Sequence, residues 1–456
     1  MSDFAKIFKA YDIRGVVPDE LDENLAEIIG AAFVRLTGAE AIVTVHDMRT
    51  SSAPLAEAFG RGAAGQGADV VAAGLGSTDM LYYASGSLGL PGAMITASHN
   101  PSKYNGIKLC YAGAKPVGQD TGLAELRAMA EAGVPAGQGS RGAVTEKDLL
   151  GGYATYLKAL VDLSGIRPLK VVVDAGNGMA GHTVPRVFQG LPLEVVPMFF
   201  ELDGTFPNHE ANPIDPRNLR DLQHGVTEHG ADIGLAFDGD ADRCFVVDER
   251  GGIVSPSVLT ALIAVRELAR EPGASVIHNL ITSRAVPEII AEHGGVPVRT
   301  RVGHSFIKAE MAAAGAIFGG EHSGHFYFRD FWFADSGMLA ALHALAALGS
   351  QDEPLSQLLA QYSRYSASGE INSEVTDQAA VTARVRDEFS GRPGVSMDEL
   401  DGLTVSGPDW WFNVRPSNTE PLLRLNVEAA SEAEMITLRD EVLRIERGHD
   451  DTRETA

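Results

Sequence analysis

A serine in a turn that directly follows an apolar run is the first candidate for chemistry in this sequence. Residues 93–97 are mostly apolar and predict a short buried strand, which breaks into Ser98-His-Asn-Pro101. Proline lacks the backbone N–H that a strand uses, so the strand must end in a turn. We expect the turn to lift the Ser98 hydroxyl clear of the fold, where it can act as a nucleophile or carry phosphate. The alternative is a structural turn whose Ser and Asn bond their own backbone.

A second candidate site consists of three carboxylates at alternate positions between two apolar runs: Asp238, Asp240 and Asp242. Carboxylates at this spacing repel one another unless a cation is present, and oxygen ligands suit Mg²⁺ or Ca²⁺ rather than zinc. A hairpin turn and a calcium-binding loop that ends at Glu249 are the alternatives. Arg243 stands at the sixth position, where the calcium loop needs glycine, and the flanking runs predict strands, so we favour Mg²⁺.

A third loop is rich in glycine and polar side chains and precedes the aromatic run 326–328. Glycines let a backbone approach a ligand closely. Its polar residues can hold sugar hydroxyls. The alternatives to a sugar-binding loop are a zinc site and a polar turn without a function. The candidates in this loop are Glu321, Ser323, His322 and His325.

A fourth loop combines an arginine with hydroxyl and amide side chains ahead of the alternating strand pattern 422–427. An arginine, hydroxyls and exposed backbone N–H groups together suit a phosphate dianion. An Asn/Pro turn is the alternative, but such a turn needs no arginine. The candidates are Arg415, Ser417, Asn418 and Thr419.

Several single residues near these loops are further candidates for binding or catalysis. Arg14 stands in a glycine-terminated turn, Lys108 follows the Ser98 turn, and His304 is expected in a loop after a strand. A general base needs a tunable pKa near the site, so Lys108 is the first candidate base, followed by Arg14 and His325. We expect substrate contacts from Tyr11, His99, Arg243 and His304.

Composition limits the partners of this 456-residue chain. Its net charge is −24, from 37 basic and 61 acidic side chains, which argues against nucleic acid and anionic membranes. Any phosphate site must therefore be built from local cations and backbone N–H groups. The two cysteines form no disulfide framework and fit a reducing cytoplasm. We find no signal peptide and no apolar run long enough to span a membrane.

Short β-branched runs alternate with Ala/Leu-rich amphipathic patterns, which predicts parallel sheets with crossover helices. Strands are expected at 41–45, 70–73 and 171–174, and helices at 25–36, 55–64 and 258–268. Gly-rich or polar stretches at 133–142, 250–253, 349–355 and 366–373 suggest breaks between domains. The expected domains are 1–148, 149–252, 253–366 and 367–456.

In their order along the chain, the four loops resemble those of the α-D-phosphohexomutase superfamily, most closely bacterial phosphomannomutase/phosphoglucomutase. The resemblance extends from Tyr11-Asp-Ile-Arg-Gly15 to Glu420-Pro421. It implies four domains around a central cleft, namely three similar α/β units with mixed sheets and a smaller C-terminal α+β domain. His46, Ile281 and His322 stand where family members vary, which bears on the preferred sugar.

The resemblance also implies a role for each loop. Ser98 would be the phosphoserine, and its phosphate would bind Mg²⁺ together with Asp238, Asp240 and Asp242. Glu321 and Ser323 would bind sugar hydroxyls. The phosphate that is not transferred would bind the fourth loop, through Arg415, Ser417, Asn418 and Thr419.

The implied activity is a phosphohexomutase that interconverts hexose 1-phosphate and hexose 6-phosphate of mannose or glucose. The reaction would pass through a phosphoserine enzyme and a hexose 1,6-bisphosphate intermediate, with Mg²⁺ as cofactor. We expect small hexose phosphates as the only partners, a cytoplasmic location, and a monomer or homodimer. The alternatives are a phosphoglucosamine mutase and a non-catalytic protein that binds sugar phosphate or Ca²⁺.

Overall fold

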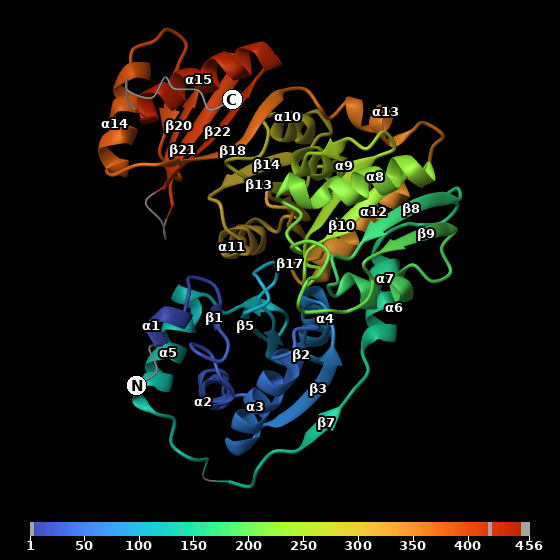
Figure 1. Ribbon diagram of the computed structural model, residues 1–456, viewed down its shortest axis with the longest axis vertical. Helices are drawn as coiled ribbons and strands as arrows, with labels where there is room; N and C mark the ends of the chain where they lie inside the picture. The colour runs from blue at the N-terminus through green and yellow to red at the C-terminus, as the bar shows by residue number, and fades with distance from the viewer. Residues whose placement is uncertain (1–3, 138, 418–421, 448–456) are drawn as a thin grey trace.

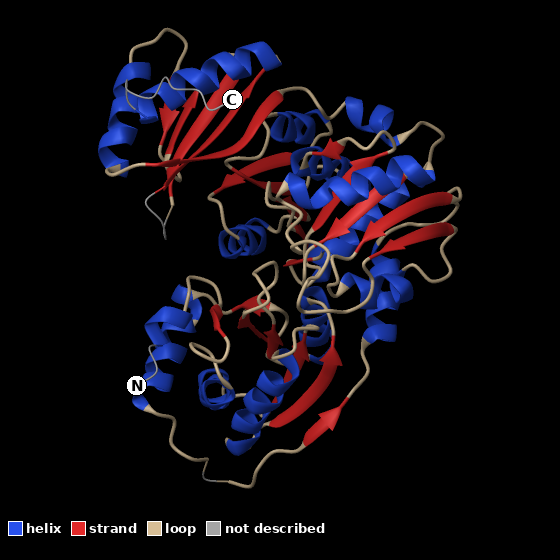
Figure 2. Cartoon of the chain, in the orientation of Figure 1, coloured by secondary structure: helices blue, strands red, loops and turns tan. Residues whose placement is uncertain are grey.

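The structure is a computed structural model that describes residues 4–137, 139–417 and 422–447 (Figure 1). Four sheets follow one another along the chain, the first with seven strands and the other three with five each. Helices pack on the sheets in every unit, as Figure 2 shows. The order of elements confirms the predicted fold class, three α/β units and a smaller C-terminal unit.

The first unit has strand order β1-β5-β4-β2-β3-β7 with β6 paired to β5, and its central strands β2 and β4 are the most buried. Strands β3 and β4 run parallel to β2, whereas β5 is antiparallel to β4, so the sheet is mixed. The elements are α1 (Phe4–Ile7), β1 (Ile13–Val16), α2 (Glu23–Thr37), β2 (Ala41–His46), α3 (Ser52–Gly65), β3 (Asp69–Leu75), α4 (Thr78–Leu88), β4 (Gly92–Ile95), β5 (Tyr104–Tyr111), β6 (Lys115–Pro116), the 3₁₀ turn Gln119–Thr121, α5 (Leu123–Ala132) and β7 (Val144–Glu146).

The second unit has strand order β12-β11-β10-β8-β9. Strand β10 runs parallel to β8 and antiparallel to β11, which gives another mixed sheet. The elements are α6 (Leu150–Leu160), β8 (Leu169–Asp174), α7 (Ala180–Val187), β9 (Leu193–Met198), the 3₁₀ turn Pro216–Leu219, α8 (Arg220–His229), β10 (Ile233–Phe237), β11 (Cys244–Asp248) and β12 (Ile253–Val254).

The third unit has strand order β14-β13-β15-β16-β17, with β13 parallel to β15 and β15 antiparallel to β16. His304 was expected in a loop, but it is the first residue of helix α11. The elements are α9 (Pro256–Arg270), β13 (Ser275–Asn279), α10 (Ala285–Glu292), β14 (Val296–Thr300), α11 (His304–Ala314), β15 (Phe318–Gly320), β16 (Phe326–Phe328), the 3₁₀ turn Arg329–Phe331, β17 (Ala334–Asp335), α12 (Gly337–Gly349) and α13 (Leu355–Ala360).

The fourth unit is an antiparallel sheet of order β18-β22-β21-β20-β19, on which α14 and α15 pack. The polar stretch 366–373, expected as a break, is strand β18, because pairing with β22 satisfies its backbone while polar side chains face solvent. The elements are β18 (Ser366–Glu374), α14 (Gln378–Phe389), β19 (Ser396–Asp398), β20 (Leu403–Ser406), β21 (Trp410–Pro416), β22 (Leu422–Ala429) and α15 (Glu432–Arg447).

One hydrophobic core joins the first three units, and the fourth has a core of its own. Helix α12 lies at the centre of the shared core, with every residue from Gly337 to Gly349 buried. A small cluster of Leu280, Ile281 and Trp411 connects the third unit to the fourth. Much more buried apolar surface therefore joins the first three units to one another than joins the fourth unit to the third. In the described part of the chain, none of the helices is both long and apolar enough to cross a membrane.

The four loops singled out in the sequence occupy equivalent places in the four sheets. Each connects two neighbouring antiparallel strands: β4 to β5, β10 to β11, β15 to β16 and β21 to β22. A reversal of this kind leaves the described polar residues of each loop near the end of a sheet, on a rigid support. The fold thus repeats one way of presenting functional side chains.

Candidate active site

Residues of the first three units line one cavity of about 320 Å³. The cavity contains most of the predicted catalytic and binding residues, which are far apart in the sequence. Those in its lining are Tyr11, Arg14, Ser98, His99, Lys108, Asp242, Arg243, Ser323 and His325. Clustering of basic, acidic and hydroxyl groups in one cavity is the usual property of a site that binds a charged small molecule.

Ser98 adopts a left-handed backbone conformation, with φ of 49°, in the turn after β4. Its hydroxyl donates a hydrogen bond of 2.7 Å to Oδ2 of Asp238, and its N–H donates to Oγ1 of Thr96. We expected the Ser98 hydroxyl to be exposed, but this expectation is wrong. Only 4% of the residue is exposed, because the turn of the second unit that contains Asp238 packs onto it. Positive φ in a non-glycine residue is uncommon and is often found at functional sites.

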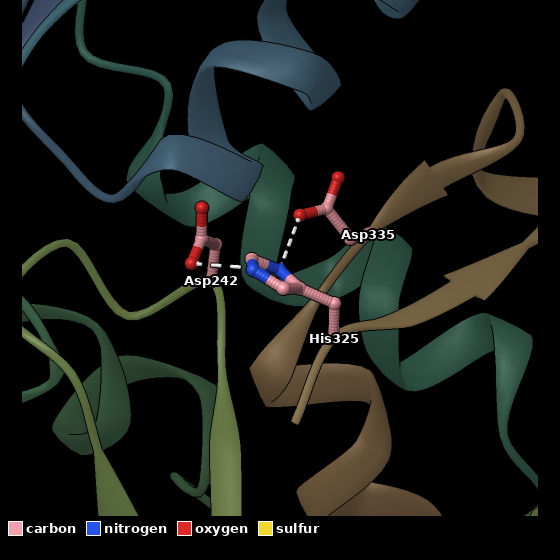
Figure 3. Close-up of side chains that lie close together, drawn as sticks. All are labelled: Asp242, His325 and Asp335. Atoms are coloured by element: carbon pink, nitrogen blue, oxygen red, sulfur yellow. Dashed lines mark hydrogen bonds and ion pairs between the residues drawn. The ribbon is translucent and has the colours of Figure 1, made fainter. Parts of the chain in front are cut away.

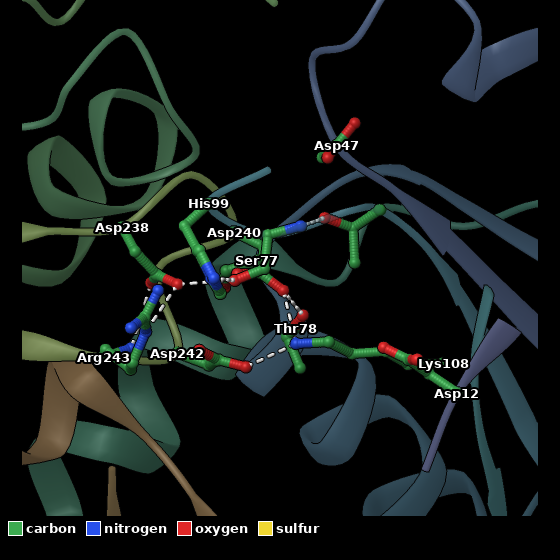
Figure 4. Close-up of polar contacts among 12 residues, drawn as sticks. Asp12, Asp47, Ser77, Thr78, His99, Lys108, Asp238, Asp240, Asp242 and Arg243 are labelled. Atoms are coloured by element: carbon green, nitrogen blue, oxygen red, sulfur yellow. Dashed lines mark hydrogen bonds and ion pairs between the residues drawn. The ribbon is translucent and has the colours of Figure 1, made fainter. Parts of the chain in front are cut away.

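Asp238, Asp240 and Asp242 lie in the turn between β10 and β11 and are all buried (Figure 4). One oxygen from each carboxylate lies within 4.8 Å of the others. In the described residues, Oδ1 of Asp240 and Oδ1 of Asp242 have no hydrogen-bond partner. Buried, unpartnered carboxylate oxygens are costly without a cation, so this donor set fits Mg²⁺.

The calcium-loop alternative fails on two observations. The flanking elements are strands, not helices, and the twelfth residue of the pattern points elsewhere. Glu249 accepts hydrogen bonds from the backbone N–H and the hydroxyl of Ser356 instead of approaching the aspartates. The hairpin alternative is correct for the backbone, because β10 and β11 are antiparallel neighbours. The turn between them carries the acidic cluster.

Two basic side chains balance the three carboxylates (Figure 4). Nζ of Lys108 lies 2.7 Å from Asp240 and 2.6 Å from Asp242, and Nε of Arg243 lies 2.9 Å from Asp238. Burial acts to lower the pKa of Lys108, but the two carboxylates outweigh it and raise the pKa above its ordinary value. Lys108 is thus held as an ammonium ion in this arrangement.

His325 ends the turn between β15 and β16 and faces two carboxylates (Figure 3). Its Nδ1 lies 3.0 Å from Oδ2 of Asp335 and 3.8 Å from Oδ1 of Asp242. Burial acts to lower the pKa of His325, but Asp242 and Asp335 outweigh it and raise the pKa. An imidazole with its Nδ1 engaged by a carboxylate has its Nε2 left for proton transfer.

Asp335 and Lys308 were missed in the sequence. Both line the cavity, and Nζ of Lys308 lies 2.7 Å from Oδ1 of Asp335. Asp335 ends the apolar run 331–335, and Lys308 stands on α11 without a recognisable loop pattern. In the sequence, each of these residues is only a charged residue in a mostly apolar stretch. That pattern does not distinguish a residue of a functional site from a charged residue on a helix surface.

Arg14 and His99 are two further residues of the first unit that line the cavity. Arg14 donates hydrogen bonds to the side chains of Asn100, in the Ser98 turn, and of Asp12. Burial, with a contribution from Arg243, lowers the pKa of His99 well below its ordinary value. A neutral His99 adds no charge beside the Ser98 hydroxyl, whose oxygen lies 3.3 Å from its Nδ1.

Glu321 is buried at the start of the third loop, where several donors hold its carboxylate. Oε2 accepts hydrogen bonds from Tyr327 at 2.7 Å and Ser323 at 3.5 Å, and Oε1 accepts one from the N–H of Gly303 at 3.2 Å. These contacts fix the carboxylate beside Ser323, which lines the cavity. The pair offers an acceptor and a hydroxyl to a bound ligand.

Arg415 lies at the end of β21 in the fourth unit, and the cavity lining described above comes from the other three units. Its Nη2 lies 3.3 Å from Oε2 of Glu370, and its Nη1 lies 3.9 Å from Oδ2 of Asp401. Ser417 is nearly buried, whereas Asn418 and Thr419 fall outside the described residues. Among the described residues of this loop, Arg415 therefore lies outside the cavity that Ser98 lines.

Comparison with known proteins extends over nearly the whole chain. Models of the phosphoglucomutase/phosphomannomutase family match residues 5–133 (alpha/beta/alpha domain I), 152–252 (domain II), 256–365 (domain III) and 370–445 (C-terminal domain). A Salmonella montevideo protein named phosphomannomutase is 40% identical over 441 residues, which is 95% of this chain and 96% of that protein. A Xanthomonas campestris pv. campestris protein named phosphohexose mutases is 41% identical over 444 residues, 97% of this chain and 99% of its own.

Solved structures agree with the sequence comparison. The X-ray structure of a phosphoglucomutase/phosphomannomutase family protein from Burkholderia thailandensis superposes with a TM-score of 0.88 at 34% identity, covering 100% of this chain and 99% of that one. A putative phosphomannomutase from Thermus thermophilus gives a TM-score of 0.83 at 25% identity, covering 98% and 100%. The chain therefore belongs to the phosphoglucomutase/phosphomannomutase family.

Proposed function

We propose that this protein is a phosphohexomutase that interconverts hexose 1-phosphate and hexose 6-phosphate through a phosphoserine at Ser98. The observation that carries the proposal is the contact between the Ser98 hydroxyl and Asp238, a member of the acidic cluster. A structural turn would not need a member of a buried carboxylate cluster of another unit against its serine. The family relationship supports the same reaction class, isomerisation by phosphoryl transfer.

The proposed transfer uses groups that line the cavity or contact its lining residues. Asp238, Asp240 and Asp242 would hold Mg²⁺, which when bound neutralises charge on the transferring phosphoryl group. Arg243, fixed against Asp238, adds positive charge beside Ser98. Phosphoserine at residue 98 would transfer its phosphoryl group to a substrate hydroxyl, and the serine oxygen leaves with the bonding electron pair.

Proton transfer falls to His325 and Lys108 in this proposal. A base must accept the proton of the attacking substrate hydroxyl, and His325 suits this role because Asp335 engages its Nδ1, so that Nε2 is the nitrogen left for proton transfer. Lys108, held as an ammonium ion, donates a proton to the departing serine oxygen. Arg14 positions the serine turn through Asn100.

The intermediate would be a hexose 1,6-bisphosphate that turns end for end and returns its other phosphate to Ser98. Glu321 and Ser323 would bind the 3- and 4-hydroxyls in both orientations, because these hydroxyls are related by the pseudo-symmetry of the ring. Tyr11, His99 and His304 would contact the substrate. Arg415, Ser417, Asn418 and Thr419 would bind the phosphate that is not transferred. A site that ignores the 2-hydroxyl would accept both mannose and glucose.

We also propose domain ranges 1–148, 149–252, 253–366 and 367–456, a cytoplasmic location, and a monomer or homodimer. Small hexose phosphates would be the partners. The larger shared core of the first three units supports a fourth unit that moves as a separate body. Such movement would bring Arg415 toward a bound substrate.

Two measurements test the function. Intact mass after incubation with glucose 1,6-bisphosphate should increase by one phosphate, whereas a binding protein would gain none. A coupled assay with mannose, glucose and glucosamine 1-phosphates should give turnover with mannose, glucose or both. Turnover with glucosamine 1-phosphate alone would show that the protein is a phosphoglucosamine mutase. No turnover with any of the three sugars would contradict the proposal that the protein is a mutase.

A further inference from the structure

Arg49 is a buried arginine whose guanidinium bonds only backbone and one carboxylate. It follows β2, and 3% of the residue is exposed. Nη2 donates to the carbonyl of Ser98 at 2.8 Å and to that of Asn100 at 2.7 Å. Nη1 donates to the carbonyls of Pro101 at 3.0 Å and Tyr104 at 2.9 Å. All four terminal N–H groups therefore bond the stretch 98–104, which runs from the serine turn to the first residue of β5.

The remaining N–H group of the guanidinium faces its counter-ion. Nε lies 3.3 Å from Oδ2 of Asp47, and both side chains are almost fully buried. Oδ1 of Asp47 accepts hydrogen bonds from the backbone N–H of Arg49 and from the hydroxyl of Ser52. Asp47 thus holds Arg49 at its backbone N–H and at Nε, so that the guanidinium is a rigid support for the serine turn.

The second unit covers this support from the other side. The ring of Phe206 lies over the guanidinium, with its centroid 5.0 Å from Cζ of Arg49. A side chain on Gly239 would place its Cβ 2.4 Å from the carbonyl oxygen of Ser98. The Ser98 peptide is therefore held between Arg49 and the turn that contains Gly239, and a shift of the serine turn would change the distance from Ser98 to Asp238.

We propose that Arg49 is a positioning residue that holds the Ser98 turn in the geometry required for phosphoryl transfer. The inference rests on the proposed function. Arginine suits the role because a planar guanidinium directs its N–H groups along fixed directions to several acceptors. Lysine carries the same charge on one nitrogen with three N–H groups and cannot reach four carbonyls on both sides of the turn.

The test compares Arg49→Lys with Arg167→Lys. Arg167 also bonds backbone carbonyls, those of Pro168 and Gln351, and a carboxylate, Asp232, none of which lines the cavity. In Arg49→Lys, kcat and the rate of Ser98 phosphorylation by glucose 1,6-bisphosphate should each fall by about tenfold to a hundredfold, the usual effect of a misplaced reacting group. The KM for hexose phosphate should stay within about twofold, because substrate contacts are intact. Arg167→Lys should keep both rates.

Hydrogen exchange separates positioning from general destabilisation. The N–H groups of Ser98, Asn100 and Tyr104 bond within or next to the turn. Peptides that contain them should exchange faster in Arg49→Lys, with exchange in the α12 core unchanged. Wild-type kcat in Arg49→Lys, or a loss of kcat without faster exchange of the turn, would overturn the proposal.

A milder variant, Asp47→Asn, keeps the guanidinium but removes its counter-ion, and it serves if Arg49→Lys does not fold. It should show a smaller loss of kcat in the same direction, and wild-type kcat in folded Asp47→Asn would also overturn the proposal. Failure of the proposed function has a different signature. In that case the wild-type chain itself would take up no phosphate from glucose 1,6-bisphosphate.

Discussion

The hydroxyl of Ser98 donates a 2.7 Å hydrogen bond to Asp238, a residue 140 positions later in the chain and in a different unit. The contact joins the turn after β4 to the turn between β10 and β11, so the proposed phosphoryl carrier and the proposed metal ligands form one site. Assembly of this site requires the first two units to dock correctly, which their shared hydrophobic core ensures.

Ser98→Ala should take up no phosphate and lose most turnover, because the hydroxyl is the proposed phosphoryl carrier. Peptide mapping of the wild-type protein after incubation with glucose 1,6-bisphosphate should place the phosphate on Ser98. Ser77→Ala is a control, since Ser77 is a buried serine that caps α4. Phosphate found only on another residue would contradict the assignment.

Asp240→Asn should lower turnover by at least about tenfold, which corresponds to roughly 1.4 kcal/mol of barrier. The asparagine keeps the shape but removes one of three charges that would bind Mg²⁺. Calorimetry should show weaker Mg²⁺ binding, and chelation should abolish turnover of the wild-type protein while its circular dichroism is unchanged. Glu249→Gln is the control, because Glu249 bonds Ser356 and not the cluster. Full activity after exhaustive chelation would show that the metal has no role.

Arg415→Lys should raise the KM for hexose phosphate by an amount equivalent to about 1–3 kcal/mol, the range for hydrogen bonds to charged groups. Lysine keeps the charge but loses the planar fork that bonds two phosphate oxygens. Arg424→Lys is a matched control on the neighbouring strand, because Arg424 also pairs with Glu370. Steady-state kinetics measure both variants. Equal effects in both, or none in Arg415→Ala, would show that this loop does not bind phosphate.

Asp79 should make stability depend on pH. Its buried carboxylate in α4 accepts hydrogen bonds from Tyr153 of the second unit and Ser336 of the third. Burial raises the pKa of Asp79 from 3.8 to about 7. The folded protein therefore binds this proton more tightly than the unfolded chain does, and the bound proton adds to the free energy of unfolding. This contribution is complete below the pKa of the unfolded chain and is lost as pH rises toward 7.

Asp79→Asn removes this titration and should give a flatter stability profile. Relative to the variant, the wild type should lose up to roughly 1.4 kcal/mol per pH unit between about pH 4 and pH 7. Urea unfolding followed by tryptophan fluorescence at several pH values measures the difference. Parallel profiles of the two proteins would mean that Asp79 does not titrate in this range.

Local sequence patterns were enough to predict the loops and the elements around them. The apolar runs before Ser98 and Asp238 are strands β4 and β10, and Gly324 lies in a turn between strands, as its position among polar residues indicates. These predictions succeeded because strand and turn formation depend on nearby residues, namely on proline, glycine and apolar periodicity. The resemblance of the four loops to one superfamily also required no structure.

The tertiary structure alone decided which residues meet and how they are charged. It buried Ser98, which its turn predicted to be exposed, and placed Asp335 beside His325 and Arg49 beneath the serine turn. These contacts join residues that are distant in sequence, and packing around a shared core determines them. Charge and pKa depend on the same packing, since Lys108 is an ammonium ion here because Asp240, 132 residues away, lies 2.7 Å from it.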